Sequence, residues 1–166
     1  TDNSFFDVMS WEFARGRPFT EAELRAGAPV VVLGDTVREE LFGALDPMGA
    51  MVRVGNVSMR VIGVLRPKGQ STFGQDQDDF VVVPFATLAR RLAGSDELGA
   101  IFASGVAGAD TGRVKSRLET LLRERRRVMP GELPDFFVRD MKEIAATVGG
   151  VTDVLTSLLA AIAAVS

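Results

Sequence analysis

Apolar residues in this chain gather into short runs that are separated by glycine, proline and polar residues. Residues 61–65 and 80–83 are β-rich apolar runs, and residues 28–33 form a third one. Runs of this kind are typical of strands that are buried on both faces of a sheet. Two further stretches, Met51–Val54 and Val57–Leu65, flank Gly55-Asn56, whose residues tolerate positive φ, so we expect them to pair as a hairpin.

Helical patterns alternate with these runs. Thr20 is a good N-cap for a short helix through Ala26, because Glu23 occupies the capping-box position. Asp35 is expected to cap a helix over residues 36–42. Residues 84–92 predict a helix with proline in its first turn. Residues 5–13 predict a short aromatic helix that supplies Trp11 and Phe13 to the core.

The clearest helix covers residues 110–128, and a strand is expected on each side of it, over residues 100–106 and 136–138. Its apolar residues fall on one face at helical spacing: Val114, Leu118, Leu121 and Leu122. The helix ends in the run Arg123-Glu-Arg-Arg-Arg127. A solvated last turn that suits the helix macrodipole explains these cations most simply, and attraction to anionic lipid headgroups is the main alternative.

The most informative segment is the polar loop between the runs at residues 61–65 and 80–83. It is too long for a plain hairpin, and long ordered loops in compact domains tend to be functional. Glycines flank Phe73, the one large apolar residue of the loop, which either contacts a partner or tucks into the core. We take the loop as a candidate contact or gating segment and name its residues: Lys68, Gly69, Gln70, Ser71, Phe73, Gly74, Gln75, Asp76, Asp78 and Asp79.

Catalytic and metal chemistries fit this loop poorly. The stretch from Gly69 to Gly74 is one residue too long for a serine nucleophile elbow, and a chain without histidine cannot assemble a Ser-His-Asp triad. The acidic cluster has Phe80 where a calcium loop needs a third oxygen ligand. We therefore expect Asp76 and Asp78 to solvate a turn, and we predict no catalytic residue, no metal and no cofactor.

Composition limits the remaining classes of function. The 166 residues are 46% hydrophobic, enough to bury a core, and the net charge of −3 argues against a nucleic-acid partner. The absence of cysteine excludes disulfides and thiolate metal sites without indicating a compartment. After Asp153 the sequence contains no charge, and alanines at 160, 161, 163 and 164 suit close packing of helices. This end of the chain predicts either a buried terminal helix or the first part of a membrane span.

Several fragments, in this order and spacing, resemble one known family. They are Val31-Val-Leu-Gly34, Leu41-Phe-Gly43, Asp46-Pro-Met-Gly49, Val61-Ile-Gly-Val64, Lys68-Gly-Gln-Ser71, Phe73-Gly-Gln-Asp-Gln-Asp-Asp79 and Val83-Pro84. Together they resemble the extracytoplasmic (periplasmic) core domain of MacB-type ABC transporter permeases, of the FtsX-like family. The likeness runs from about Gly16 to the C-terminal end.

The order of the elements, with strands that alternate with helices, a β-hairpin and then helix-strand-helix, predicts a mixed α+β fold in two subdomains. The resemblance describes the two halves. One is β-rich and contains the loop, and the other is a βαβ-like porter-type layer that ends in a helix leading into a membrane span. The core domain would comprise residues 1–148, and residues 149–166 would begin a truncated transmembrane helix.

The resemblance also implies a non-enzymatic role in export at the bacterial inner membrane, with this domain on the periplasmic side. ATP would be hydrolysed by an ABC ATPase domain outside this chain. The expected partners are a second permease copy and a periplasmic adaptor (membrane-fusion) protein. The alternative is a soluble module that binds a small molecule or a peptide, although one tryptophan and no tyrosine offer few aromatic groups for a ligand site.

Overall fold

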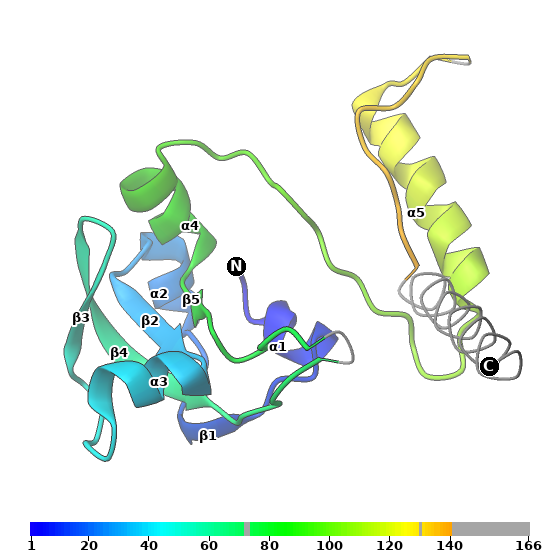
Figure 1. Ribbon diagram of the computed structural model, residues 1–166. Coiled ribbons are helices and arrows are strands. Elements are labelled where there is room, and N and C mark those ends of the chain that lie inside the picture. Colours follow the sequence, from blue (N-terminus) through cyan, green and yellow to red (C-terminus); the bar gives the residue numbers. More distant parts are fainter. Residues whose placement is uncertain (72–73, 130, 141–166) are drawn as a thin grey trace, which may run out of the picture. The chain divides into compact units, whose positions relative to one another are not determined.

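The computed structural model describes residues 1–71, 74–129 and 131–140. Its chain divides into two compact units, which we treat separately: unit 1 is Thr1–Ala103 and unit 2 is Ser104–Ser166. Unit 1 combines one mixed sheet with several short helices, and the described part of unit 2 contains one longer helix (Figure 1). The α+β class predicted from the sequence is therefore confirmed.

The sheet of unit 1 is built around strand β4 (Val57–Leu65). On one side β4 pairs antiparallel with β1 (Phe13–Gly16) and with β3 (Met51–Val54), and the β3–β4 hairpin has the predicted bounds. On the other side it pairs parallel with β2 (Val30–Leu33). The short strand β5 (Val81–Val82) pairs antiparallel with the far edge of β2.

Both faces of this sheet are covered, as the unbroken apolar runs predict. All four residues of β2 are buried, and their side chains alternate between the two faces. Val30 and Val32 join one cluster with the aromatic side chains of Phe6, Trp11 and Phe19. Val31 and Leu33 join the second cluster, against which Val37 and Phe42 of helix α3 (Asp35–Phe42) pack.

A bulge in β4 lets this strand contribute to both clusters. The register between β2 and β4 shifts at Ile62, so that Val31 opposes Val61 whereas Val32 opposes Gly63. Met59 and Val61, before the bulge, belong to the second cluster, whereas Ile62 and Leu65 belong to the first. One extra residue reverses the alternation of side chains along the strand.

The short helices follow the local signals closely. Helix α2 (Glu21–Ala26) has the predicted capping box, in which the Thr20 hydroxyl accepts from the Glu23 amide and the Glu23 carboxylate accepts from the Thr20 amide. Helix α4 (Phe85–Thr87) continues into a π-helical turn, η1 (Leu88–Ala93), which ends at Gly94. Together α4 and η1 confirm the helix predicted over residues 84–92.

Two helix boundaries predicted from the sequence are wrong. Helix α1 covers only Ser4–Val8, and Phe13 starts strand β1 instead of ending the helix. Gly34, not Asp35, is the N-cap of α3, and the Asp35 carboxylate pairs with Arg38 at 2.8 Å. Asp35 is already inside the first turn, where a carboxylate favours the positive end of the helix dipole. Trp11 is buried as predicted, and Phe13 packs against the same cluster.

The predicted strands on either side of the long helix are also wrong. Helix α5 (Thr111–Arg126), capped by Asp110, confirms the predicted helix, but residues 100–106 and 136–138 form no strand. An extended segment becomes a strand only when a neighbouring strand satisfies its backbone, and neither segment is paired with one among the described residues. The helix predicted from Met141 onward lies outside the described residues. Within the described part, no helix has both the length and the apolar character needed to cross a membrane.

The ion pair between Arg17 and Glu23 should make the stability of unit 1 depend on acid pH. Two hydrogen bonds of 2.8 Å join the guanidinium to the carboxylate and lower the pKa of Glu23 from 4.5 to about 2. Because the folded pKa lies below the unfolded value, the stabilisation is complete above pH 4.5 and disappears as the pH falls towards 2. Urea unfolding at several pH values should therefore show a stability gap between wild type and Glu23→Gln that closes over this range.

Glu40→Gln provides the matched control for this series. Glu40 is an exposed carboxylate of α3 with no hydrogen bond or ion pair to any described residue. Because Glu40→Gln breaks no contact to a described residue, it shows the effect of removing one exposed carboxylate alone. A constant gap between wild type and Glu23→Gln from pH 5 to pH 2 would contradict the role of the Arg17 pair.

Candidate functional site

The loop that joins β4 to β5 crosses the end of β2, because β2 lies between the two strands that the loop connects. The crossing is tight. The amide of Gly34, which follows β2, donates to the carbonyl oxygen of Phe80 at 2.9 Å, and a Cβ at Gly34 would overlap the carbonyl oxygen of Asp78. Glycine at this position therefore lets the loop lie against the strand end and the first turn of α3.

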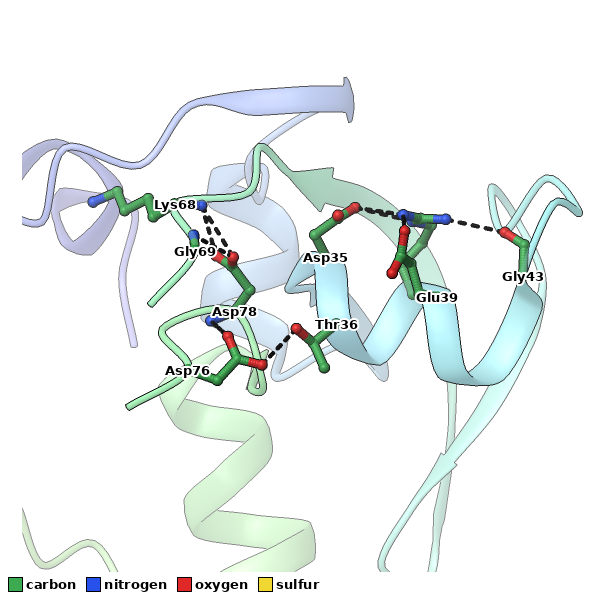
Figure 2. Close-up of polar contacts among 9 residues, drawn as sticks. Asp35, Thr36, Glu39, Gly43, Lys68, Gly69, Asp76 and Asp78 are labelled. Atoms are coloured by element: carbon green, nitrogen blue, oxygen red, sulfur yellow. Dashed lines mark hydrogen bonds and ion pairs between the residues drawn. The ribbon is translucent and has the colours of Figure 1, made fainter. Parts of the chain in front are cut away.

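Asp78 is the centre of the loop. Its residue surface is only 4% exposed, and its carboxylate accepts from the amides of Lys68 at 2.9 Å and Gly69 at 2.7 Å. Figure 2 shows this carboxylate between the start and the end of the loop. A charged acceptor strengthens hydrogen bonds from backbone amides, so Asp78 ties the two ends of the loop together.

Asp76 ties the same loop to helix α3. One carboxylate oxygen accepts from the Thr36 hydroxyl at 2.7 Å, and the other accepts from the Asp78 amide at 2.8 Å (Figure 2). Both hydrogen bonds lower the pKa of Asp76 below its usual value, and the bond from the Thr36 hydroxyl has the larger effect. Asp76 therefore stays ionised at neutral pH and holds the loop against the start of α3.

Lys68 ties the start of the loop to the N-terminal segment. Its ammonium donates to the carbonyl oxygen of Met9 at 2.6 Å and lies 4.0 Å from the ring centroid of Trp11. Trp11 in turn packs against Phe80, with ring centroids 5.2 Å apart. A cation over the face of a tryptophan ring is attracted by the ring. The exposed Lys68 therefore helps to fix Trp11 in its contact with Phe80.

The described residues on either side of the loop tip are joined by backbone hydrogen bonds and present polar groups to solvent. The amide of Ser71 donates to the carbonyl of Gln75 at 2.8 Å, and the amide of Gly74 donates to the carbonyl of Ser71 at 2.9 Å. Gln70 and Asp76 form an isolated antiparallel bridge. Gln70, Gln75 and Gln77 are exposed. Phe73 lies outside the described residues, so both alternatives for its side chain stay open.

The predicted site residues lie together in the loop, but Asp76 and Asp78 make hydrogen bonds that the sequence did not predict. The expectation that Asp78 solvates a turn is wrong, because its carboxylate is buried and bonded to backbone amides. Asp76 and Asp79 are exposed. No group of three histidine, cysteine, aspartate or glutamate residues in the described part of the chain could hold a metal ion.

Three partners of the loop were missed from the sequence: Gly34, Thr36 and the carbonyl of Met9. They lie about 40 to 60 positions away from the loop, as the separations of 40 and 59 residues in two of the hydrogen bonds show. The turn at Gly34-Asp35 is visible in the sequence, but only the order of the strands reveals that the loop passes over it.

Two surface hollows occur elsewhere. One, of about 410 Å³, lies at the first turns of α5 and is lined by residues that include Asp110, Arg113 and Arg117. The other, of about 470 Å³, lies beside α4 and η1 and is lined by residues that include Phe85, Arg90 and Asp96. Neither of these two hollows is lined by residues of the loop.

Comparison with known proteins identifies the family of this chain. The profile of the MacB-like periplasmic core domain matches residues 1–121, which is most of the chain. The chain belongs to this family. The resemblance seen in the sequence fragments is thereby confirmed.

Relatives with curated names support the same assignment to the MacB family. The chain is 34% identical over its whole length to the "Macrolide export ATP-binding/permease protein MacB" of Wolinella succinogenes, and covers 25% of that protein. A protein of the same name from Rhodospirillum rubrum is 39% identical over 96% of the chain, which covers 24% of the relative. The MacB-like domain thus spans about a quarter of the length of these two relatives.

Solved structures share the fold. The periplasmic region of MacB from Actinobacillus actinomycetemcomitans matches 89% of the chain and 63% of that structure, with a TM-score of 0.71 at 24% identity. The extracellular domain of the noncanonic ABC-type transporter YknZ from Gram-positive bacteria matches 77% of the chain and 63% of that structure, with a TM-score of 0.62 at 21% identity. At these identities the likeness concerns the fold alone.

Replacing Asp78 should loosen the loop of this MacB-like domain and cost stability. Asp78→Ala removes the acceptor of the Lys68 and Gly69 amides, and we expect the free energy of unfolding to fall by about 1–3 kcal/mol. Denaturant unfolding measures this loss, and hydrogen exchange should show faster exchange at these two amides. Asp79→Ala, at an exposed neighbour, should change stability by about 0.5 kcal/mol or less. Equal effects of the two variants would contradict the stabilising role of the Asp78 carboxylate.

Proposed function

We propose that this chain is the periplasmic domain of an ABC exporter permease in the bacterial inner membrane. The observation that carries the proposal is the family match over residues 1–121, in a chain whose curated relatives are named as macrolide export ATP-binding/permease proteins. The fold of unit 1, shared with the periplasmic region of a MacB protein, supports it.

In this proposal the domain converts events at the ATPase into movement outside the membrane. Hydrolysis takes place in an ABC ATPase domain that this chain does not contain. Coupling over such a distance needs elements that move as rigid bodies between two arrangements. Unit 1 is suited to this role, because its sheet is packed on both faces and its crossing loop is tied to the sheet end, to α3 and to the N-terminal segment.

The loop at residues 68–79 is the proposed contact or gating surface of the domain. Its buried end is fixed by Asp78, whereas its tip offers exposed amide side chains at Gln75 and Gln77. Partners for such a surface are a second permease copy and a periplasmic adaptor protein. The described residues of the loop are already held by hydrogen bonds, so they lose little conformational freedom when a partner binds, which favours affinity.

Single-cysteine labelling tests both the location and the coupling. This chain contains no cysteine, so Gln75→Cys can be introduced into an otherwise cysteine-free full-length transporter. A membrane-impermeant maleimide should label it in intact spheroplasts, because the loop lies outside the cytoplasm. In the purified transporter, the labelling rate should change severalfold between the nucleotide-free state and a nucleotide-trapped state.

Ser58→Cys is the control for this experiment. Ser58 is exposed but lies on β4 within the hairpin, so its labelling should be equally external and insensitive to nucleotide. Labelling of Gln75→Cys only after the cells are permeabilised would overturn the proposed location. External labelling with identical rates in both nucleotide states would overturn the proposed coupling while leaving the location intact.

The contact role of the loop has its own test. The double variant Gln70→Ala/Gln75→Ala should reduce export, or adaptor co-purification, by about tenfold at unchanged thermal stability, because it removes exposed side chains for which the structure shows no hydrogen bond to a described residue. The double variant Glu40→Ala/Ser58→Ala, at exposed positions outside the loop, should retain both properties. Phe73→Ala should behave like the glutamine variant if its side chain contacts the partner, whereas a large fall in melting temperature would assign that side chain to the core.

A further inference from the structure

Helix α5 carries a charge that differs sharply from the rest of the chain. Residues 111–127 contain seven lysine and arginine residues and two glutamates, a net charge of +5 in a chain with net charge −3. The remainder of the chain is therefore strongly acidic, with a net charge of −8. A segment with this excess of positive charge attracts ligands of opposite sign.

The helix dipole does not account for this pattern. It favours cations in the last turn, where Arg123, Arg125 and Arg126 lie, but it disfavours them near the start of the helix. Arg113 nevertheless lies in the first turn of α5, which contains no acidic residue. Arg127 ends the helix in the left-handed conformation at φ 55°, where glycine is usually preferred. The solvated-turn explanation thus covers only part of the helix.

Most of these cations have no counter-charge within the part of the chain that the structure describes. Two of the seven are set apart: Arg126 pairs with Asp135 at 3.0 Å, and Lys115 also has an interaction partner. No ion pair to a described residue is seen for five arginines of the helix: Arg113, Arg117, Arg123, Arg125 and Arg127. No carboxylate of the described residues neutralises their charge.

Apolar side chains accompany the charges. No residue of α5 is buried, and Leu121 on its apolar face is 47% exposed. Directly after the arginine run, Met129 is 67% exposed and Leu133 is 92% exposed. A basic helix accompanied by exposed large apolar side chains is typical of a segment that lies at a membrane surface, where the cations reach phosphate groups and the apolar groups enter the interface.

We propose that α5, through Arg123, Arg125 and Arg127, docks on the surface of a membrane that contains anionic phospholipids. The apolar side chains that flank the arginine run favour a lipid surface over an acidic protein. The inference goes beyond the proposed function and rests on it only for the location beside a membrane. The docking would anchor unit 2 at the bilayer independently of any transmembrane segment.

Vesicle co-sedimentation of the chain tests this proposal. We expect much stronger binding to vesicles that contain phosphatidylglycerol than to vesicles of phosphatidylcholine alone, and a loss of the difference at high salt. The triple variant Arg123→Gln/Arg125→Gln/Arg127→Gln should lower the apparent partition coefficient on phosphatidylglycerol vesicles on the order of 10- to 100-fold. Any contribution of the apolar C-terminal residues is the same in both proteins and cancels in the comparison.

A matched triple variant separates a specific surface from net charge. Arg53→Gln/Arg60→Gln/Arg91→Gln removes the same charge from exposed positions of unit 1 and should bind as the wild type does. Circular dichroism checks that both variants fold. Equal losses in the two variants, or binding that is indifferent to phosphatidylglycerol, would overturn the proposal. Neither result would touch the exporter assignment, which the labelling of Gln75→Cys tests separately.

Discussion

The burial of β2 between β4 and β5 is the constraint on which the rest of unit 1 depends. Val31, Val32 and Leu33 have no exposed surface, and their side chains alternate between two hydrophobic clusters. A strand in this position needs a neighbour on each edge and a layer on each face. The chain meets this need by placing β4 and β5 on opposite sides of β2, so that the segment between them has to cross the strand end.

That crossing explains why a charged side chain is buried in the loop. A connection over a strand end leaves backbone amides that no neighbouring strand can satisfy, and unpaired buried amides are costly. The carboxylate of Asp78 satisfies two of them, at Lys68 and Gly69, while Gly34 leaves room for the loop to approach. In this MacB-like domain, the acidic cluster therefore serves first to satisfy backbone amides where the loop crosses the strand end. Any contact that the tip makes with a partner depends on these hydrogen bonds.

Local signals predicted much of the fold and little of the site. The hairpin at Gly55-Asn56, the capping box of α2 and helix α5 depend on neighbours within a few residues, and all were predicted correctly. The strands expected at residues 100–106 and 136–138 depended on pairing partners that the local pattern cannot supply. The hydrogen bond from Thr36 to Asp76 spans 40 residues and follows from strand order alone. The loop residues could be named from sequence, but the buried role of Asp78 could not.

The loop tip and the basic face of α5 would bind through different kinds of interaction. The loop tip is neutral at its amide side chains and is held by hydrogen bonds, so its binding energy would come from shape and from little entropy lost on contact. The basic face of α5 would act through long-range attraction, which tolerates loose geometry and weakens with salt. On the two proposals, a reversible and non-directional attachment to the bilayer would leave the directional contact of the loop free to form and break. On the proposed function, the surface whose shape must be kept is therefore the one that the fold ties at three points, through Asp78, through Thr36 and through the Met9 carbonyl.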